Sequence, residues 1–133
     1  MKTALFELQK AIYTSLSNHQ PLTDKVKAIL DDTEPDQAFP YVTIGEPSSV
    51  PAYTKTSTRE EIAWTLHCWS KYQGRKESME ILNLMNEAFT QQPLSLGGGF
   101  SVSSFNAEQI QVITDIDGET RHGILRVRFV VHQ

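Results

Sequence analysis

Two neighbouring segments in the middle of the chain carry the clearest hydrophobic patterns. Between residues 59 and 70, apolar side chains recur at every second position, at Ile62, Trp64, Leu66 and Cys68. A period of two is typical of a half-buried strand. After Gly74 the period becomes helical, which predicts an amphipathic helix over residues 75–90 that ends before Pro93. Its apolar face is expected to hold Met79, Leu82, Met85 and Phe89, widened by Ile81, Leu84 and Ala88.

The first forty residues predict helical structure followed by an acidic connection. An amphipathic helix is expected over residues 3–17, with its apolar side chains at Leu5, Leu8, Ile12 and Leu16. A short second helix is predicted from Thr23, whose hydroxyl can cap it, to residue 26 or 28. Residues 29–38 form an acidic connector, after which Pro40 starts a strand that continues to Gly45.

Residues 46–58 have the composition of a loop. They contain two prolines and many serines and threonines, and they show no clear hydrophobic period. A connection of this length within a small domain is usually functional or disordered. The sequence therefore predicts a flexible loop at 46–58, which is either an arm that a neighbouring molecule orders or a variable surface loop.

The last third of the chain predicts a run of strands. Gly97-Gly98-Gly99 suits a turn between short apolar segments at 94–96 and 100–102. Two longer strands are predicted at 102–114 and 120–132, joined by a hairpin at Asp117-Gly118. The final strand separates into a core face with Leu125, Val127, Phe129 and Val131, and an opposite face with Arg126, Arg128 and His132.

These elements predict one α+β domain over residues 1–133. We expect an antiparallel sheet of four to five strands with the two main helices packed on one face. The order along the chain is helix, short helix, strand, strand, helix and three strands. A length of 133 residues fits a single domain, and 39% hydrophobic with 21% charged residues is typical of a soluble globular protein.

Charge changes this picture in two ways. The formal net charge of −4 argues against a general DNA-coating role, which needs a basic surface. The charges are also unevenly distributed along the chain. An early run is acidic (Asp31, Asp32, Glu34, Asp36 and Glu46), whereas cations dominate later segments (Lys71, Arg75, Lys76, Arg121, Arg126 and Arg128). Oppositely charged surfaces suit head-to-tail contacts between copies, although two solvated faces are the simpler interpretation.

Arg75 and Lys76 fall in the first turn of the predicted main helix, where the helix dipole is positive and acidic residues are preferred. Three explanations fit this placement. The two cations have an acidic partner outside the subunit, they serve catalysis, or they are exposed enough for the penalty to be small. An exposed charge at a helix end is worth only about 0.3–1 kcal/mol.

No group of residues supports catalysis, and neither a cofactor nor a metal site is predicted. The four histidines (His19, His67, His122 and His132) lack the spacing of metal ligands. Asp115 and Asp117 fit ordinary turn chemistry better than a pair of catalytic carboxylates. Cys68 is the only cysteine, which excludes an intrachain disulfide, and a small buried thiol is expected there.

The chain shows neither a signal-peptide core at its N-terminus nor an apolar run near the roughly 20 residues that a membrane span needs. We therefore expect a protein that is made in the cytoplasm, stays soluble there and has no membrane partner.

Three segments carry a family resemblance, and they are Phe39–Glu46, His67–Glu77 and Asp117–Gly123. Their order and spacing resemble those of the small tail-terminator proteins of long-tailed phages, also called tail-completion or tail-to-head joining proteins. The resemblance runs over nearly the whole chain. It implies a structural virion protein that lies at the tail-neck junction, and in the host cytoplasm during assembly. It also implies a ring, with six subunits, that caps the finished tail tube and stops its polymerisation.

The resemblance further implies three partners: other copies of the chain, the tail tube protein, and a head-side connector or stopper protein. The expected contact residues are the charged ones (Lys71, Arg75, Lys76, Arg126, Arg128, Asp31, Asp32, Glu34 and Asp36). The alternative is a small module for single-stranded nucleic acid that presents Trp69, Tyr72 and the same cations. The acidic balance and the lack of an aromatic-rich central strand count against it, and no sequence-specific nucleic acid is expected as a partner.

Overall fold

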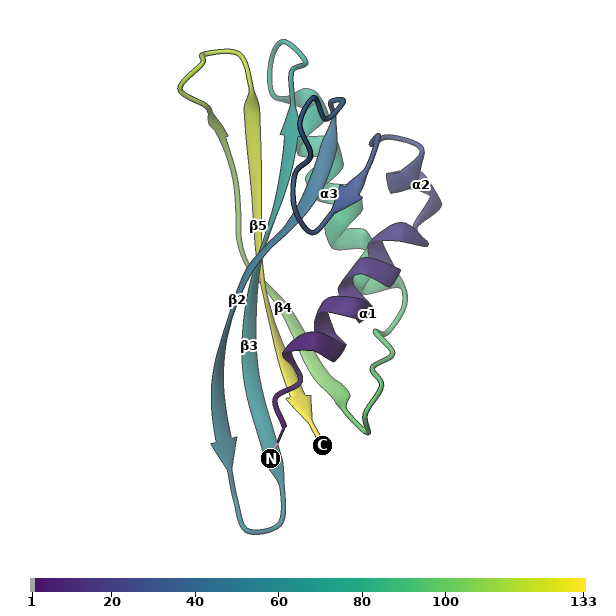
Figure 1. Ribbon diagram of the computed structural model, residues 1–133, viewed down its shortest axis with the longest axis vertical. Helices are drawn as coiled ribbons and strands as arrows, with labels where there is room; N and C mark the ends of the chain where they lie inside the picture. Colours follow the sequence, from purple (N-terminus) through teal and green to yellow (C-terminus); the bar gives the residue numbers. More distant parts are fainter. Residues whose placement is uncertain (1) are drawn as a thin grey trace.

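The computed structural model describes residues 2–133 as a twisted five-stranded sheet with two long helices (Figure 1). The helices are α1 (Leu5–Ser17), the short α2 (Gln20–Thr23) and α3 (Lys76–Gln91). The strands are β1 (Ile29–Leu30), β2 (Tyr41–Tyr53), β3 (Thr58–Ser70), β4 (Ser101–Thr114) and β5 (Arg121–His132). Their order across the sheet is β1-β2-β3-β5-β4. The predicted α+β single domain is confirmed, but β1 runs parallel to β2, so the sheet is mixed and only mostly antiparallel.

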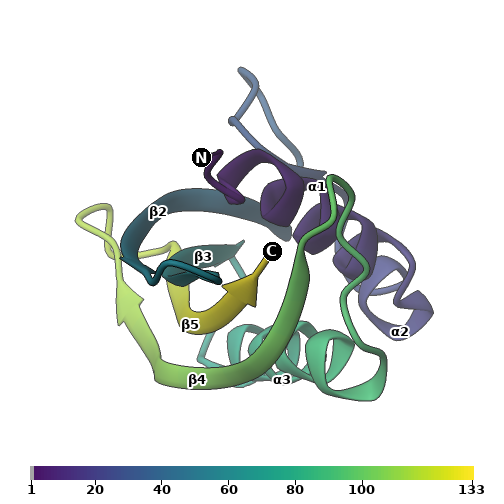
Figure 2. The same cartoon turned by 90° about the horizontal axis from the view of Figure 1, so that it is seen from below.

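The hydrophobic core lies between one face of the sheet and the two long helices, with α1 next to β2 and α3 next to β4 and β5 (Figure 2). The alternating apolar side chains of β3 and β5 supply the sheet side, and all are at most 2% exposed: Ile62, Trp64, Leu66, Cys68, Leu125, Val127, Phe129 and Val131. Gly123 on β5 lies opposite Cys68, and a Cβ atom there would clash with the Cys68 sulfur and stand 3.1 Å from Leu82 Cδ1 on α3. The packing of α3 on the sheet therefore requires glycine at this position.

The two helical predictions need correction in detail. The short helix begins at Gln20 and ends at Thr23, because Pro21 suits the first turn of a helix and begins it earlier than a cap at Thr23 would. On α3, Met79 is 52% exposed. The helix is rotated by about one position relative to the prediction, and its buried residues are Ser78, Ile81, Leu82, Met85, Ala88 and Phe89.

The fifth strand lies elsewhere in the chain than predicted. Residues 94–96 are not part of a strand, and the fifth strand is instead β1, inside the segment expected to be a connector. β1 pairs only with Val42 and Thr43 at the start of β2. The two predicted C-terminal strands are confirmed, and Gly118 at their turn has a φ of +73°, which favours glycine.

The segment predicted as a loop at residues 46–58 is mostly a β-hairpin. β2 continues through it to Tyr53 and pairs with β3, after a bulge that follows Ile44. Only residues 54–57 form the turn, in which the Thr54 amide donates to the Ser57 carbonyl at 2.9 Å. The loop prediction is wrong here because its two prolines stand on a sheet edge, where proline is tolerated. We call residues 46–58 the arm, and it extends from the lower end of the molecule (Figure 1).

A buried carboxylate ties the base of the arm to the first helix. Glu60 on β3 is 3% exposed. Its carboxylate accepts hydrogen bonds from the Ser49 hydroxyl at 2.6 Å, the Thr3 hydroxyl at 2.7 Å and the Ala4 amide at 2.7 Å. Burial alone would raise the pKa of Glu60, but these three hydrogen bonds outweigh it and lower the pKa. Since Ala4 caps α1, the negative charge also stabilises the positive end of that helix.

Candidate interaction surfaces

Three predicted contact residues lie between the end of β3 and the start of α3, and they are Lys71, Arg75 and Lys76. Arg75 is the N-cap residue of α3 and Lys76 its first residue, with a side chain that is 79% exposed. Lys76 Nζ lies 4.0 Å from Glu80 Oε1 one turn later, so this carboxylate partly offsets the unfavourable dipole. Lys25 Nζ also reaches Glu80, at 2.6 Å, and its hydrogen bond lowers the pKa of Glu80. Among residues 2–133, Arg75 pairs with no carboxylate.

The acidic run lies in the connection from β1 to β2, and its four predicted contact residues are all exposed: Asp31, Asp32, Glu34 and Asp36. This connection and the turn at residues 71–75 lie in the same upper half of the molecule (Figure 1). Lys71 Nζ stands 4.7 Å from the ring centroid of Phe39, just beyond the acidic run. Charges of both signs therefore share one end of the subunit instead of marking two separate surfaces.

Arg126 and Arg128 stand side by side on the face of the sheet that the helices leave uncovered. Both bind Glu108, which sits at a bulge of β4: Arg126 Nε lies 3.2 Å from Glu108 Oε2, and Arg128 Nε binds the other oxygen. Arg126 also donates to the Thr65 hydroxyl at 3.1 Å. The hydrogen bond from Arg128 lowers the pKa of Glu108. The side chains of both arginines are about one-third exposed, at 35% and 34%, so this pair is partly neutralised within the subunit.

A cluster of aromatic and histidine side chains on the same face was not predicted as a unit. His67 Nδ1 lies 2.7 Å from His122 Nε2, and the Trp69 ring stacks on His122 with centroids 3.8 Å apart. Trp69 Nε1 donates to the Thr43 hydroxyl at 3.2 Å, and Tyr41 lies beyond it. Burial lowers the pKa of both histidines. The period of two places His67 and Trp69 on one face, but His122 joins them only through the pairing of β3 with β5.

Apolar side chains are exposed at both ends of the molecule and along β4. Ile116 projects fully into solvent at the tip of the β4–β5 hairpin, where its neighbours are acidic. Tyr53 is 55% exposed near the tip of the arm, at the opposite end (Figure 1). On β4, Ile110 is 54% and Ile113 is 39% exposed. These positions, unlike the charged ones, were not singled out from the sequence.

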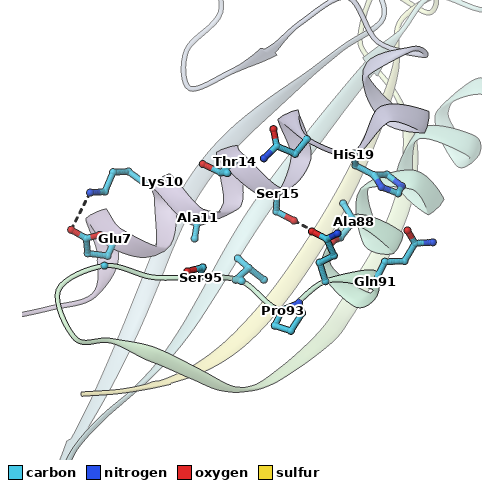
Figure 3. Close-up of a pocket in the computed structure, with 14 residues that line it drawn as sticks. Glu7, Lys10, Ala11, Thr14, Ser15, His19, Ala88, Gln91, Pro93 and Ser95 are labelled. Carbon is cyan, nitrogen blue, oxygen red and sulfur yellow. Dashed lines mark hydrogen bonds and ion pairs between the residues drawn. The ribbon is translucent and has the colours of Figure 1, made fainter.

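A groove of about 780 Å³ runs between α1 and the segment that follows α3 (Figure 3). At one end Glu7 Oε1 pairs with Lys10 Nζ at 3.1 Å. At its floor the Ser15 hydroxyl donates to the Ala88 carbonyl at 3.1 Å, which ties α1 to α3. His19 also lines the groove, and its buried Nε2 has no hydrogen-bond partner among the described residues (Figure 3). The rest of the lining is small, apolar or neutral, as with Thr14, Gln91 and Ser95. Since Glu7 is paired with Lys10 and Ser15 with the Ala88 carbonyl, the lining residues do not join an acid, a base and a nucleophile.

The isolated titratable groups behave as structural residues. Burial raises the pKa of the Cys68 thiol to about 12, as expected for a buried cysteine. Hydrogen bonds from the Thr120 hydroxyl and from the amides of Thr120 and Glu119 lower the pKa of Asp117 to about 2, which is turn chemistry. Within residues 2–133, no three His, Cys, Asp or Glu side chains approach closely enough to share a metal ion. In the same range, no helix combines the length and hydropathy needed to cross a membrane.

Known proteins match this chain over almost its full length. A family model described as tail completion protein gp17 matches residues 10–132. Tail completion protein gp17 of Bacillus phage SPP1 is 39% identical over 131 residues, which cover 98% of this chain and 96% of that protein.

The solved structures that share the fold include the following two. The structure of bacteriophage SPP1 gp17 has a TM-score of 0.67 at 39% identity, covering 96% of this chain and 91% of that one. A chain in the virion of a native gene transfer agent particle has a TM-score of 0.90 at 18% identity and covers 100% of both chains.

Proposed function

The chain belongs to the tail completion protein gp17 family, and from that membership we propose that it forms a closed ring that caps the tail tube, stops its polymerisation and joins it to the head-side connector. It is a structural component of a phage or phage-like particle, and not an enzyme. The observation that carries the proposal is 39% identity over 98% of the chain to a protein named for tail completion. The tail-terminator resemblance adds the expectation of six copies, placed at the tail-neck junction.

The shape of the subunit supports a ring with two different faces. The β4–β5 hairpin and the arm project from opposite ends of the long axis (Figure 1). The first tip surrounds the exposed Ile116 with Asp115, Asp117 and Glu119. The second is rich in hydroxyl groups and carries Lys55 as its charge. When subunits stand side by side in a ring, one rim presents the acidic tips and the other the arms, which suits two different partners.

The charged end of the subunit supports one of these contacts in particular. Arg75 and the largely exposed Lys76 lie with the acidic run 31–36 at the same end as the acidic hairpin tip. We assign this end to a polar contact with the tail tube or the connector protein. Arg126 and Arg128, which bind Glu108, belong to the uncovered face of the sheet. Because Glu108 partly neutralises them, we expect these arginines to contribute only weakly to a charged contact between subunits.

The alternative of a single-stranded nucleic-acid module is supported only at the turn before α3, where Tyr72 is 53% exposed and Arg75 pairs with no carboxylate within residues 2–133; the other residues assigned to it are engaged within the subunit. Such a module presents unpaired cations beside open aromatic rings. Here Arg126 and Arg128 bind Glu108, and Trp69 is stacked on His122 and bonded to Thr43.

Electron microscopy of the purified chain, alone and mixed with tail tubes, tests the proposed function. We expect closed rings, and tubes that carry one ring at one end and no longer elongate. A matched preparation without the chain should contain tubes that fail to join heads. The proposal would be refuted if mature particles contained single copies of the subunit instead of a ring, or contained none.

A further inference from the structure

The five-stranded sheet has two open edges that differ in chemistry. One is the whole outer side of β4, since β4 ends the strand order β1-β2-β3-β5-β4. The other is β2 beyond Thr43, because β1 pairs only with Val42 and Thr43. The open part of β2 includes the strand of the arm. On each of these edges, every second residue points its backbone N–H and C=O to the open side, where they lack a strand partner within residues 2–133.

The β4 edge has few of the devices that keep sheet edges from pairing. Exposed edges are normally protected by lysine, proline, bulges or shortness. β4 is 14 residues long and contains no lysine or proline, and its two bulges, between Val102 and Ser104 and between Ala107 and Gln109, both lie before residue 109. Its one charged residue, Glu108, is bound to Arg126 and Arg128. Residues 109–114 are uncharged, rich in β-branched side chains and free of bulges, and Ile110 and Ile113 are exposed. Such a stretch is a site for pairing with another strand.

The open edge of the arm is protected against pairing with the arm of another copy. After the bulge that follows Ile44, the ladder between β2 and β3 is continuous from Pro47 through Pro51 to Tyr53. Proline cannot donate a ladder hydrogen bond, so the nitrogens of these residues point to the open side. Two arms placed edge to edge would lose hydrogen bonds at the prolines of both copies. An arm placed beside β4 loses them in one copy only, because β4 retains all its donors.

We propose that the outer edge of β4 pairs with the outer edge of the arm of a second copy of this chain. Both strands are uncharged along the segment concerned, residues 47–53 on the arm and all of β4 except Glu108. Each copy offers one β4 edge and one arm edge, so the contact is heterologous. Repeated from subunit to subunit, such contacts form a ring when the rotation closes. This inference rests on the proposed ring and names the surface that joins its members. It makes the sheet continuous around the ring.

Disulfide cross-linking tests this contact, because the native Cys68 is buried and unreactive. Val50→Cys, on the uncovered face of the arm, is combined in turn with Asn106→Cys, Gln109→Cys or Gln111→Cys on the same face of β4. Several β4 positions are used because a disulfide requires Cα atoms closer than about 7 Å, so each double variant reports on a different register of the two strands. Val50→Cys with Met79→Cys is the matched control, since Met79 is 52% exposed but lies on α3.

Under mild oxidation of the assembled full chain, at least one double variant should give a ladder of covalent oligomers that ends at the size of the ring. Each single variant and the Met79 control should stay monomeric. Rings that form without cross-linking above the control would overturn the proposed contact and leave the ring intact. A ladder without closed rings would uphold the contact and overturn the ring. Dimers from Val50→Cys alone would show arm-to-arm pairing and overturn the contact, and the absence of any association would overturn both.

Discussion

Replacing Glu60 separates the contribution of one buried charge from that of the surrounding packing. Glu60→Ala removes the acceptor for three donors, the Ala4 amide and the Thr3 and Ser49 hydroxyls. Ala4 is 0% exposed, so its amide cannot turn to water, whereas the hydroxyl groups can rotate. The substitution thus leaves one buried donor without a partner and removes an anion from the start of α1.

The magnitude follows from these two losses. An unsatisfied buried donor costs about 1–3 kcal/mol. A charge at a helix N-terminus contributes about 0.3–1 kcal/mol, and somewhat more when partly buried. We therefore expect Glu60→Ala to lower the free energy of unfolding by about 1–4 kcal/mol. Glu60→Gln keeps the shape and one acceptor oxygen, so about 1–2 kcal/mol is expected.

The charge also makes part of the stability depend on pH. The pKa of Glu60 is lower in the folded chain than in the unfolded chain, where it is about 4.3. A lowered folded pKa means that the stabilisation is fully present above the unfolded pKa and is lost as pH falls through the folded value. The wild type should therefore lose this increment below about pH 4.3. Glu60→Gln should lack that part of the acid dependence.

The assay is denaturant unfolding at pH 7 and at several values below pH 5, for both Glu60 variants. Glu61→Gln is the matched control, because Glu61 is the next residue and its side chain is 40% exposed in a pair with Arg59. An exposed pair contributes about 0–1 kcal/mol. If Glu60→Ala unfolds at the same denaturant concentration as the control, the buried carboxylate does not hold α1 to the arm and the reasoning fails.

Three further predictions concern the faces and ends of the subunit. Phe129→Ala should lower the free energy of unfolding by about 3–5 kcal/mol, since Phe129 is 0% exposed. Arg128→Ala should lower it by at most about 1 kcal/mol and impair only tail joining. A lowered melting temperature of the arginine variant would show that this residue is structural. Arg75→Glu should keep the fold, and Lys76→Glu should lose only a weak ion pair within the helix. Both variants should weaken assembly, in the same way that added salt weakens it for the wild type. If both assemble normally at low salt, these residues are only solvated surface. Amide hydrogen exchange on the open side of the arm, at Ser49 and Tyr53, which alternate with Pro47 and Pro51, should be fast in the free subunit and slow in the ring, and equal protection in both states would count against a neighbour at this edge.

Where a local pattern faces the core, the sequence was sufficient to predict the element. The apolar positions of β3 and β5 lie against the helices, so burial imposes a period of two that can be counted. β1 could not be found in this way. A strand of two residues is defined by its partners Val42 and Thr43, and Ile29 and Leu30 have no period of their own.

The contacts of the candidate surfaces also differ in whether they depend on local spacing or on the pairing of distant strands. The pair between Lys76 and Glu80 spans one helical turn, so its spacing alone could have revealed it. The bond from Arg128 to Glu108 depends on how β4 pairs with β5, including the bulge at Glu108. The contact between His67 and His122 depends on how β3 pairs with β5. Pairing between distant strands cannot be counted from one sequence, so these contacts were not predicted.

The arm was predicted as a loop for a reason that bears on its function. Hydrophobic alternation marks a strand only when one of its faces packs on a core. The strand of the arm, residues 46–53, has most of its side chains exposed, so its sequence keeps prolines and hydroxyl groups in place of a period of two. Its backbone is nevertheless paired with β3 as in any other strand. A hairpin that holds its pairing without a core of its own has two faces and an edge available for another molecule. The absence of a pattern at 46–58 therefore fits a surface that is completed by assembly.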